Sequence, residues 1–74
     1  MSIPLHRRQF GDRVRALRKA NGWRSQEAFA NHLNLDRTYI SGIERGVRNP
    51  TLDIIVKLAQ GLDVHPTELL STLD

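Results

Sequence analysis

The sequence has no cysteine and few aromatic residues, with two Phe, one Tyr and one Trp among 74 residues. Without cysteine, the chain forms no disulfide and offers no thiolate ligand to zinc or to an iron–sulfur cluster. Apolar runs such as residues 54–56 are too short to cross a membrane, and the first ten residues lack the apolar stretch of a signal peptide. These absences favour a small domain in the cytoplasm that does not contact a membrane.

The side chains also give no sign of catalysis or metal binding. A chain of this length rarely encloses a pocket with positioned polar groups. Its serines and carboxylates form no nucleophile–base set, and its three histidines lie in separate segments without the spacing of metal ligands: His6, His32 and His65. We therefore predict a non-enzyme with no catalytic residue, no metal site and no cofactor. Residues 1–74 are expected to form one domain, with its core in about residues 8–70.

Charge is distributed unevenly along the chain, whose net charge is +3. Residues 1–48 hold ten basic and four acidic residues, a net +6, whereas residues 49–74 hold one basic and four acidic residues, a net −3. Most of the cations are arginine, whose planar guanidinium suits phosphates and guanine edges. The pattern indicates a polyanionic partner on one side of the molecule; an ordinary solvated surface is the alternative.

Apolar residues recur with helical spacing throughout, and no stretch alternates as a strand does. The pattern predicts five helices, at residues 8–20, 26–33, 37–45, 52–62 and 66–72, hence an all-α, compact five-helix bundle. Ser25, Asp36 and Thr51 are expected to cap the second, third and fourth helices. Gly11 predicts either fraying of the first helix or a close approach of another segment. The fourth helix is expected to direct these residues inward: Leu52, Ile55, Leu58, Ala59 and Leu62.

The second and third segments have the spacing of a helix-turn-helix, with about eight residues, a three-residue turn and nine residues. Helical geometry divides the third segment into two faces. Tyr39, Ile40 and Ile43 fall on one face, and the opposite arc is short and polar: Arg37, Thr38, Ser41, Gly42 and Arg45. Such an arc fits a major groove, where Arg bonds to guanine and Thr to a base or a thymine methyl. The alternative is an ordinary exposed helix face.

Three stretches carry a family resemblance: Gln26-Glu27-Ala28-Phe29-Ala30, Leu33-Asn34-Leu35 and residues 38–46, Thr-Tyr-Ile-Ser-Gly-Ile-Glu-Arg-Gly. With Arg48-Asn49-Pro50-Thr51-Leu52 and Lys57-Leu58-Ala59, they resemble the phage-repressor and Cro (XRE) helix-turn-helix family over about residues 8–70. Within that family, residues 36–41 with Arg48 and Asn49 most resemble the controller proteins of restriction–modification systems. The resemblance implies a lambda-repressor-like fold that binds double-stranded DNA.

The resemblance also implies roles for individual residues. The positions that match base-reading residues are Arg37, Thr38, Ser41 and Gly42. The positions that match phosphate contacts are Gln26, Tyr39, Arg45, Arg48 and Asn49. Arg18 and Glu44 resemble a partly buried structural ion pair. Two departures stand out: Arg24 lengthens the turn before the second helix, which predicts a shift of Trp23 and Gln26, and Gly42 lacks a side chain with which to read a base.

The acidic C-terminal part carries more apolar residues than one small core needs. The excess positions are Ile54, Leu69, Leu70 and Leu73, of which one leucine is expected to close the core. Leftover apolar surface favours a partner, and two-fold dimers are the commonest assembly. A dimer joined at this end keeps its interface away from the DNA. We therefore expect a homodimer on a two-fold symmetric operator, with these four residues at its interface.

These features together predict a sequence-specific transcriptional regulator, either a repressor that blocks RNA polymerase or an activator that recruits it. The resemblance implies an autoregulatory controller of a restriction–modification system. Two alternatives stay open from the sequence. A DNA-binding antitoxin would also hold a toxin through the C-terminal region, and a protein–protein adaptor would bind its partner without the steep salt dependence of DNA binding.

Overall fold

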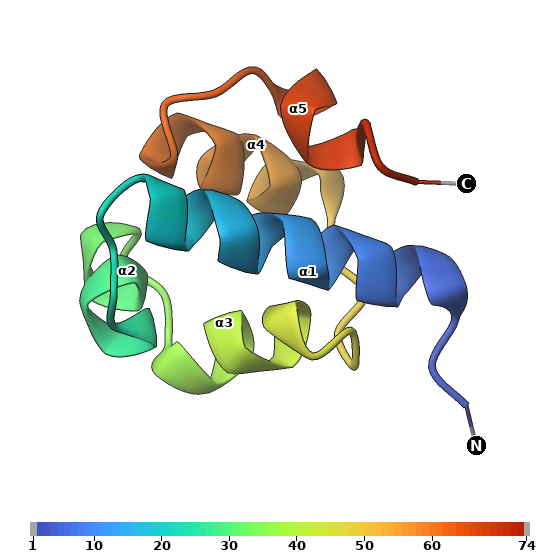
Figure 1. Cartoon of the computed structure of the whole chain (residues 1–74). Helices are drawn as coiled ribbons and strands as arrows, with labels where there is room; N and C mark the ends of the chain where they lie inside the picture. The colour runs from blue at the N-terminus through green and yellow to red at the C-terminus, as the bar shows by residue number, and fades with distance from the viewer. Residues whose placement is uncertain (1, 74) are drawn as a thin grey trace.

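The computed structural model describes residues 2–73 and folds them into five α-helices, with no strand in that range. In chain order the helices are α1 (Leu5–Ala20), α2 (Gln26–His32), α3 (Arg37–Glu44), α4 (Leu52–Gly61) and α5 (Pro66–Leu70). Figure 1 shows α1 between α3 on one side and α4 and α5 on the other. The predicted all-α bundle of five helices is confirmed.

The helix ends differ from the sequence prediction by one to three residues. Helix α1 begins at Leu5 rather than at residue 8, because the Pro4 carbonyl accepts the N–H groups of Arg7 and Arg8. Helix α5 stops at Leu70 instead of reaching residue 72. The other three helices each end one residue early. Such differences are ordinary, since terminal turns fray and side-chain periodicity does not fix them.

Ser25, Asp36 and Thr51 cap α2, α3 and α4 as predicted, each accepting a hydrogen bond from a backbone N–H in the first turn. Helix α5 has a cap that the sequence did not predict. Its Thr67 N–H donates to Nδ1 of His65 at 3.2 Å. This cap needs an unprotonated Nδ1, because a protonated ring nitrogen has no lone pair to accept a hydrogen bond.

Every helix gives the core at least one fully buried large residue, and α3 gives two: Val14, Phe29, Ile40, Ile43, Leu58 and Leu69. Smaller or slightly more exposed residues complete it: Phe10, Ala30, Leu33, Ala59 and Leu62. Each helix therefore contributes a single apolar stripe to one shared core, as amphipathic helices do.

Leu52 and Leu69 lie elsewhere than the sequence predicted. Leu52, expected to point inward, is 74% exposed. It lies one turn before Val56, which is also exposed, so this side of α4 points away from the core. Leu69, expected at a dimer interface, has no exposed surface. It is the leucine that closes the core, so it cannot contribute to an interface.

Gly11 lies where α1 crosses α3, and the structure selects close approach over fraying. A Cβ at this position would lie 2.6 Å from the Glu44 carbonyl oxygen and would also collide with the Ile43 carbonyl. Only glycine lets the two helix backbones come this close. The crossing therefore fixes the C-terminal end of α3 against the first half of α1.

Candidate nucleic-acid interface

Helices α2 and α3 pack against each other across a tight turn, as a helix-turn-helix requires. The turn depends on Asn34, which adopts a left-handed backbone conformation with φ of 58°. Asp36 then starts α3 by accepting hydrogen bonds from the backbone N–H and the hydroxyl of Thr38, at 2.8 and 2.6 Å. These bonds fix the direction in which α3 leaves the turn.

The same contacts change the acidity of the cap. The hydrogen bond from the Thr38 hydroxyl is the largest cause that lowers the pKa of Asp36 below its ordinary value of 3.8. The Thr38 backbone N–H adds to the effect, and the positive charges of Arg37 and Arg48 contribute less. The Thr38 hydroxyl proton is therefore engaged with Asp36, which leaves its oxygen lone pairs and its methyl group for other contacts.

The outer face of α3 presents the polar residues that the sequence placed there. Arg37 and Thr38 are exposed and Ser41 is half-buried, while Ile40 and Ile43 lie in the core. Arg45 is exposed one turn beyond Ser41, and its Nε donates to the Ser41 hydroxyl at 3.3 Å. A helix with this division of faces exposes short polar side chains and two guanidinium groups along one side.

Gly42 does not lie open on that face. It is buried, because the side chain of Arg48 covers it: a Cβ at Gly42 would lie 2.6 Å from Cγ of Arg48. The guanidinium carbon of Arg48 is 5.3 Å from the ring centroid of Tyr39, the distance of a cation–π contact. The sequence placed Arg48 beyond the helix and left Gly42 facing the groove. The structure instead brings Arg48 back onto α3.

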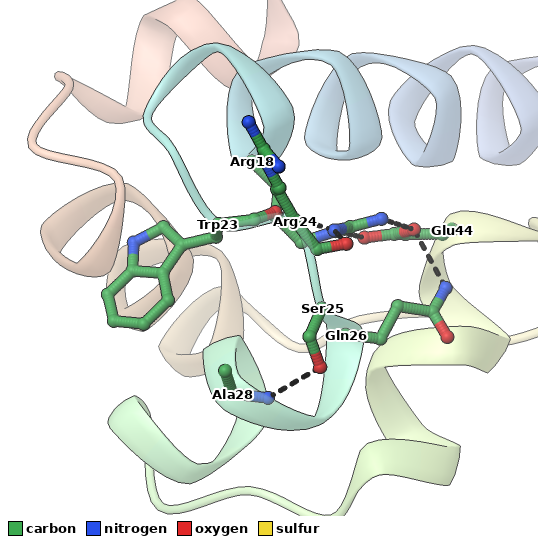
Figure 2. A network of polar contacts seen from close by, with 7 residues as sticks. All are labelled: Arg18, Trp23, Arg24, Ser25, Gln26, Ala28 and Glu44. Atoms are coloured by element: carbon green, nitrogen blue, oxygen red, sulfur yellow. Dashed lines mark hydrogen bonds and ion pairs between the residues drawn. The ribbon is translucent and has the colours of Figure 1, made fainter.

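Behind this face lies a buried polar network (Figure 2). The Nε of Arg18 donates to Oε2 of Glu44 at 2.7 Å and its Nη2 donates to Oε1 at 3.2 Å, so the pair that the resemblance implied is present and doubly bonded. Arg18 is 3% exposed and Glu44 is 6% exposed. A guanidinium and a carboxylate buried together with two hydrogen bonds hold α1 and the end of α3 in one fixed arrangement.

Gln26 joins this network at the start of α2. Its Nε2 donates to Oε1 of Glu44 at 2.9 Å, and the second N–H of the amide is not used by that bond. The longer turn that Arg24 creates is also part of the network, since Nη1 of Arg18 donates to the carbonyls of Trp23 and Arg24 at 2.7 and 2.9 Å. With this longer turn in place, α2 begins at Gln26.

The remaining expected residues lie in the loop before α4, on α4 and in the C-terminal part of the chain. Asn49 is exposed in the loop between α3 and α4. Ile54 and Leu73 are half-buried against the core, and Leu70 is 40% exposed. Figure 1 places α5 across α1 from α3. Asn49 nevertheless lines the same small cavity as Leu70 and Leu73, so the loop before α4 and the end of α5 meet.

Contacts near the polar face and across the bundle were missed from the sequence. One is the placement of Arg48 on Tyr39 and Gly42. Another is an ion pair between Arg13 of α1 and Glu68 of α5, with Nη2 and Oε2 3.1 Å apart. Arg13 also donates from Nε to the Glu68 carbonyl at 2.9 Å. Residues 55 positions apart leave no periodic signal in the sequence, so only the packing of α1 against α5 reveals this pair.

Within residues 2–73, no helix has the length and apolar character needed to span a membrane. In the same range no group of three His, Cys, Asp or Glu residues is arranged to hold a metal ion.

Comparisons with known proteins agree with this geometry. The helix-turn-helix family HTH_3 matches residues 14–69, which include all of α2, α3 and α4. Control protein C.BamHI of Bacillus amyloliquefaciens is 49% identical over 61 residues, which cover 82% of this chain and 75% of that protein.

Solved structures give the same result. The restriction–modification controller protein C.AhdI from Aeromonas hydrophila superposes with a TM-score of 0.79 at 52% identity, covering 84% of this chain and 92% of its own. The controller protein C.Esp1396I, solved as a tetramer in complex with its natural 35 base-pair operator, gives a TM-score of 0.80 at 34% identity. That match covers 92% of this chain and 88% of the other.

Proposed function

Because the chain belongs to the helix-turn-helix family that includes the restriction–modification control proteins, we propose that it is a sequence-specific DNA-binding transcriptional regulator of this controller type. The observation that carries the proposal is the exposed polar face of α3, held by the buried Arg18–Glu44 pair behind it. A short helix with such a face enters the major groove in helix-turn-helix proteins. In this proposal the protein is not an enzyme, uses no cofactor, forms a single domain and acts in the cytoplasm.

The residues of this face divide into base-reading and phosphate-binding groups. Arg37, Thr38 and Ser41 lie on the outer side of α3 and would reach base edges, Arg37 first because it lies at the N-terminal end of the helix. Gly42 acts indirectly, by giving Arg48 its place beside Tyr39. Phosphates would be bound along the border of the face, by Gln26, Tyr39, Arg45, Arg48 and Asn49.

Gln26 is well placed for its role because Glu44 fixes its amide. The bond between Nε2 and Oε1 of Glu44 leaves one amide N–H directed by the network rather than free to rotate. Fixing a donor before DNA arrives reduces the conformational entropy that is lost on binding. The buried pair thus orders α3 and a phosphate donor together.

We further propose that the protein acts as a homodimer through Ile54, Leu70 and Leu73. Leu70 is 40% exposed at the end of α5, and α5 lies across α1 from α3, so an interface on α5 leaves α3 of both copies free. Two-fold symmetry then matches a two-fold symmetric operator, with half-sites about one helical turn apart. Because the dimer forms by mass action, promoter occupancy depends steeply on protein concentration, as an autoregulatory controller requires.

The test measures binding to a duplex that carries the promoter region of the protein's own gene. Fluorescence anisotropy gives the affinity at several salt concentrations. We expect one dimer per symmetric site and an affinity that falls by roughly a thousandfold or more between 50 and 200 mM salt, given six or more phosphate contacts. A scrambled duplex serves as control and should bind at least roughly a thousandfold more weakly. Equal affinity for both duplexes, or no dependence on salt, would contradict the proposal.

A further inference from the structure

The Thr38 side chain lies exposed on the outer side of α3, in the first turn after the Asp36 cap. Its Oγ1 donates to Oδ1 of Asp36 at 2.6 Å, and its backbone N–H donates to the same oxygen at 2.8 Å. A hydroxyl group has one proton and two lone pairs. Because Asp36 takes the proton, the Thr38 hydroxyl presents only lone pairs to a ligand outside the helix.

Asp36 retains this proton for an electrostatic reason. The bond from the Thr38 hydroxyl is the largest cause that lowers the pKa of Asp36, so the carboxyl is ionised at neutral pH and has no proton of its own to donate. A hydrogen bond from a hydroxyl to a carboxylate is roughly twice as strong as one between neutral groups. Turning the hydroxyl toward a neutral acceptor on DNA would therefore exchange a stronger bond for a weaker one.

Ser41, one turn along the same face, is bonded in the opposite sense. Its hydroxyl accepts from Nε of Arg45 at 3.3 Å, a bond that uses a lone pair and not the proton. The two hydroxyls of this face therefore differ in what they offer. The bond to Asp36 uses the proton of Thr38, whereas the bond from Arg45 leaves Ser41 its proton.

We propose that Thr38 selects an amino base, adenine or cytosine, at one position of each DNA half-site by accepting a hydrogen bond from its amino group. The inference rests on the proposed function and names a chemical feature of the operator. In the major groove adenine N6 and cytosine N4 are donors, whereas guanine O6 and thymine O4 are acceptors. A carbonyl oxygen opposite the Thr38 lone pairs would leave both groups without a donor, so the same contact disfavours guanine and thymine.

The position of Thr38 suits this contact. Residues at the N-terminal end of a recognition helix reach base edges, and Thr38 is the second residue of α3. The bond to Asp36 also restricts rotation of this short side chain before DNA binds, which reduces the entropy lost on binding.

A thymine methyl is the competing contact for Thr38, through the methyl group of its own side chain. Thymine carries O4 beside that methyl, so its approach would set O4 against the lone pairs of the Thr38 oxygen. An amino base satisfies this oxygen instead. A polar group left without a partner costs more than a few methyl contacts gain, which favours the amino base.

The experiment varies the promoter duplex of the protein's own gene one base pair at a time and sequences the fraction bound by the full chain. Thr38→Val keeps the shape of threonine without the hydroxyl, while Thr38→Ser keeps the hydroxyl without the methyl group. Wild type should favour adenine or cytosine over guanine and thymine at one position of each half-site, by roughly three- to tenfold, the value of one neutral hydrogen bond. Thr38→Val should lose this preference at that position alone, and Thr38→Ser should retain it.

Variants of Asp36 test what directs the Thr38 proton. Asp36→Gly removes the acceptor at little cost to the helix, because glycine is tolerated as an N-cap. With its proton free, Thr38 should accept guanine or thymine about as well as an amino base, while preferences at other positions remain. Asp36→Asn is the matched control: it loses the same charge, but its amide oxygen still accepts the proton, so it should keep the wild-type preference. An unchanged preference in Asp36→Gly would overturn the inference.

Base analogues identify the amino group that is bound. If adenine is selected, replacing it by purine, which has no N6 amino group, should weaken wild-type binding by roughly three- to tenfold. If cytosine is selected, its analogue without the N4 amino group should have the same effect. Thr38→Val should bind the analogue and the parent duplex alike. Equal wild-type affinity for the two duplexes would contradict a hydrogen bond to the amino group.

The remaining outcomes separate this inference from the proposed function. A thymine preference that Thr38→Val keeps and Thr38→Ser loses would assign the methyl contact, and a guanine preference would make the hydroxyl a donor; either result overturns the inference and leaves the proposed function. Wild-type preferences at every position in Thr38→Val would show that Thr38 reads no base, with the same consequence. A wild-type protein that selects no sequence would overturn the proposed function itself, and this inference with it.

Discussion

Arg48 lies across Gly42, so the one residue of α3 without a side chain makes room for the side chain of a residue beyond the helix. Its guanidinium faces the ring of Tyr39 at 5.3 Å. The polar face of α3 therefore includes the Arg48 side chain, which comes from the loop after the helix. A helical wheel of residues 37–44 alone would show a gap at Gly42, whereas the folded surface has an arginine there.

Gly42→Ala should displace Arg48, because the added Cβ would occupy the space of its Cγ. Affinity should fall on operator and scrambled DNA alike, and the salt slope should fall by about one, because Arg48 is the proposed phosphate contact that moves. Helix stability should not suffer, since Ala is favoured over Gly in a helix interior by about 1 kcal/mol. Anisotropy titrations with both duplexes measure the effect. In an Arg48→Ala background the same substitution should change little, and an equal loss in both backgrounds would contradict the role of Arg48.

Arg37→Ala should weaken binding to the operator by about 1–3 kcal/mol and relax the preference at one base pair, which we expect to be a guanine pair. Binding to scrambled DNA should change much less. Arg45→Ala is the matched comparison. It should weaken binding to both duplexes alike and reduce the slope of log affinity against log salt concentration by about one, the amount expected for one lost phosphate contact. Titrations of both variants on both duplexes at several salt concentrations decide the matter. An equal loss on both duplexes for Arg37→Ala would make Arg37 a phosphate contact.

Glu44→Ala should destabilise the fold by about 3–5 kcal/mol, because Arg18 would keep a buried charge without its carboxylate. Urea denaturation measures the loss. A double-mutant cycle with Arg18→Ala should give a large coupling energy, since the two residues share two hydrogen bonds. Additive losses would show that the pair contributes no mutual stabilisation.

Leu70→Asp should give a folded monomer with weaker operator binding, because Leu70 is partly exposed at the proposed interface. Leu69→Ala should instead lower the free energy of unfolding by about 2–5 kcal/mol, since Leu69 is fully buried in the core. Circular dichroism and sedimentation equilibrium separate these effects. Unfolding of the Leu70→Asp variant would assign Leu70 to the core as well.

Asp36 should make part of the stability depend on pH. Its pKa is lowered in the folded protein, chiefly by the Thr38 hydroxyl, so its contribution is present above the ordinary value of 3.8 and is lost as the pH falls through the folded pKa. The variant Asp36→Asn retains a capping oxygen but does not titrate. The melting-temperature difference between wild type and Asp36→Asn should shrink as the pH falls from 5 to about 2. A difference independent of pH over that range would contradict this role.

The sequence predicted those parts of the interface that depend on local order. The caps at Asp36 and Thr51 and the two faces of α3 follow from residue type and helical spacing, and the structure has them. The Arg18–Glu44 pair was expected only from the family resemblance. Its residues lie 26 positions apart, so helical periodicity could not have predicted the contact.

The contacts that the sequence did not predict depend on how segments far apart in the chain pack together. Arg48 follows α3 in a loop, and only the path of that loop brings it back over Gly42. Arg13 meets Glu68 because α5 packs on α1. The apolar character of three C-terminal leucines does not predict which of them is buried: Leu69, Leu70 and Leu73. The packing of α5 buries Leu69 completely.

The crossing at Gly11 has a consequence for the length of the DNA site. Helix α1 contacts the end of α3 at Gly11 and Arg18, and from another side Arg13 bonds to Glu68 of α5. In a dimer joined through α5, the separation of the two α3 helices is then determined by the thickness of α1 and by this contact. A larger residue at position 11 would move α3 outward, and the number of base pairs between the half-sites would change while each half-site kept its own sequence.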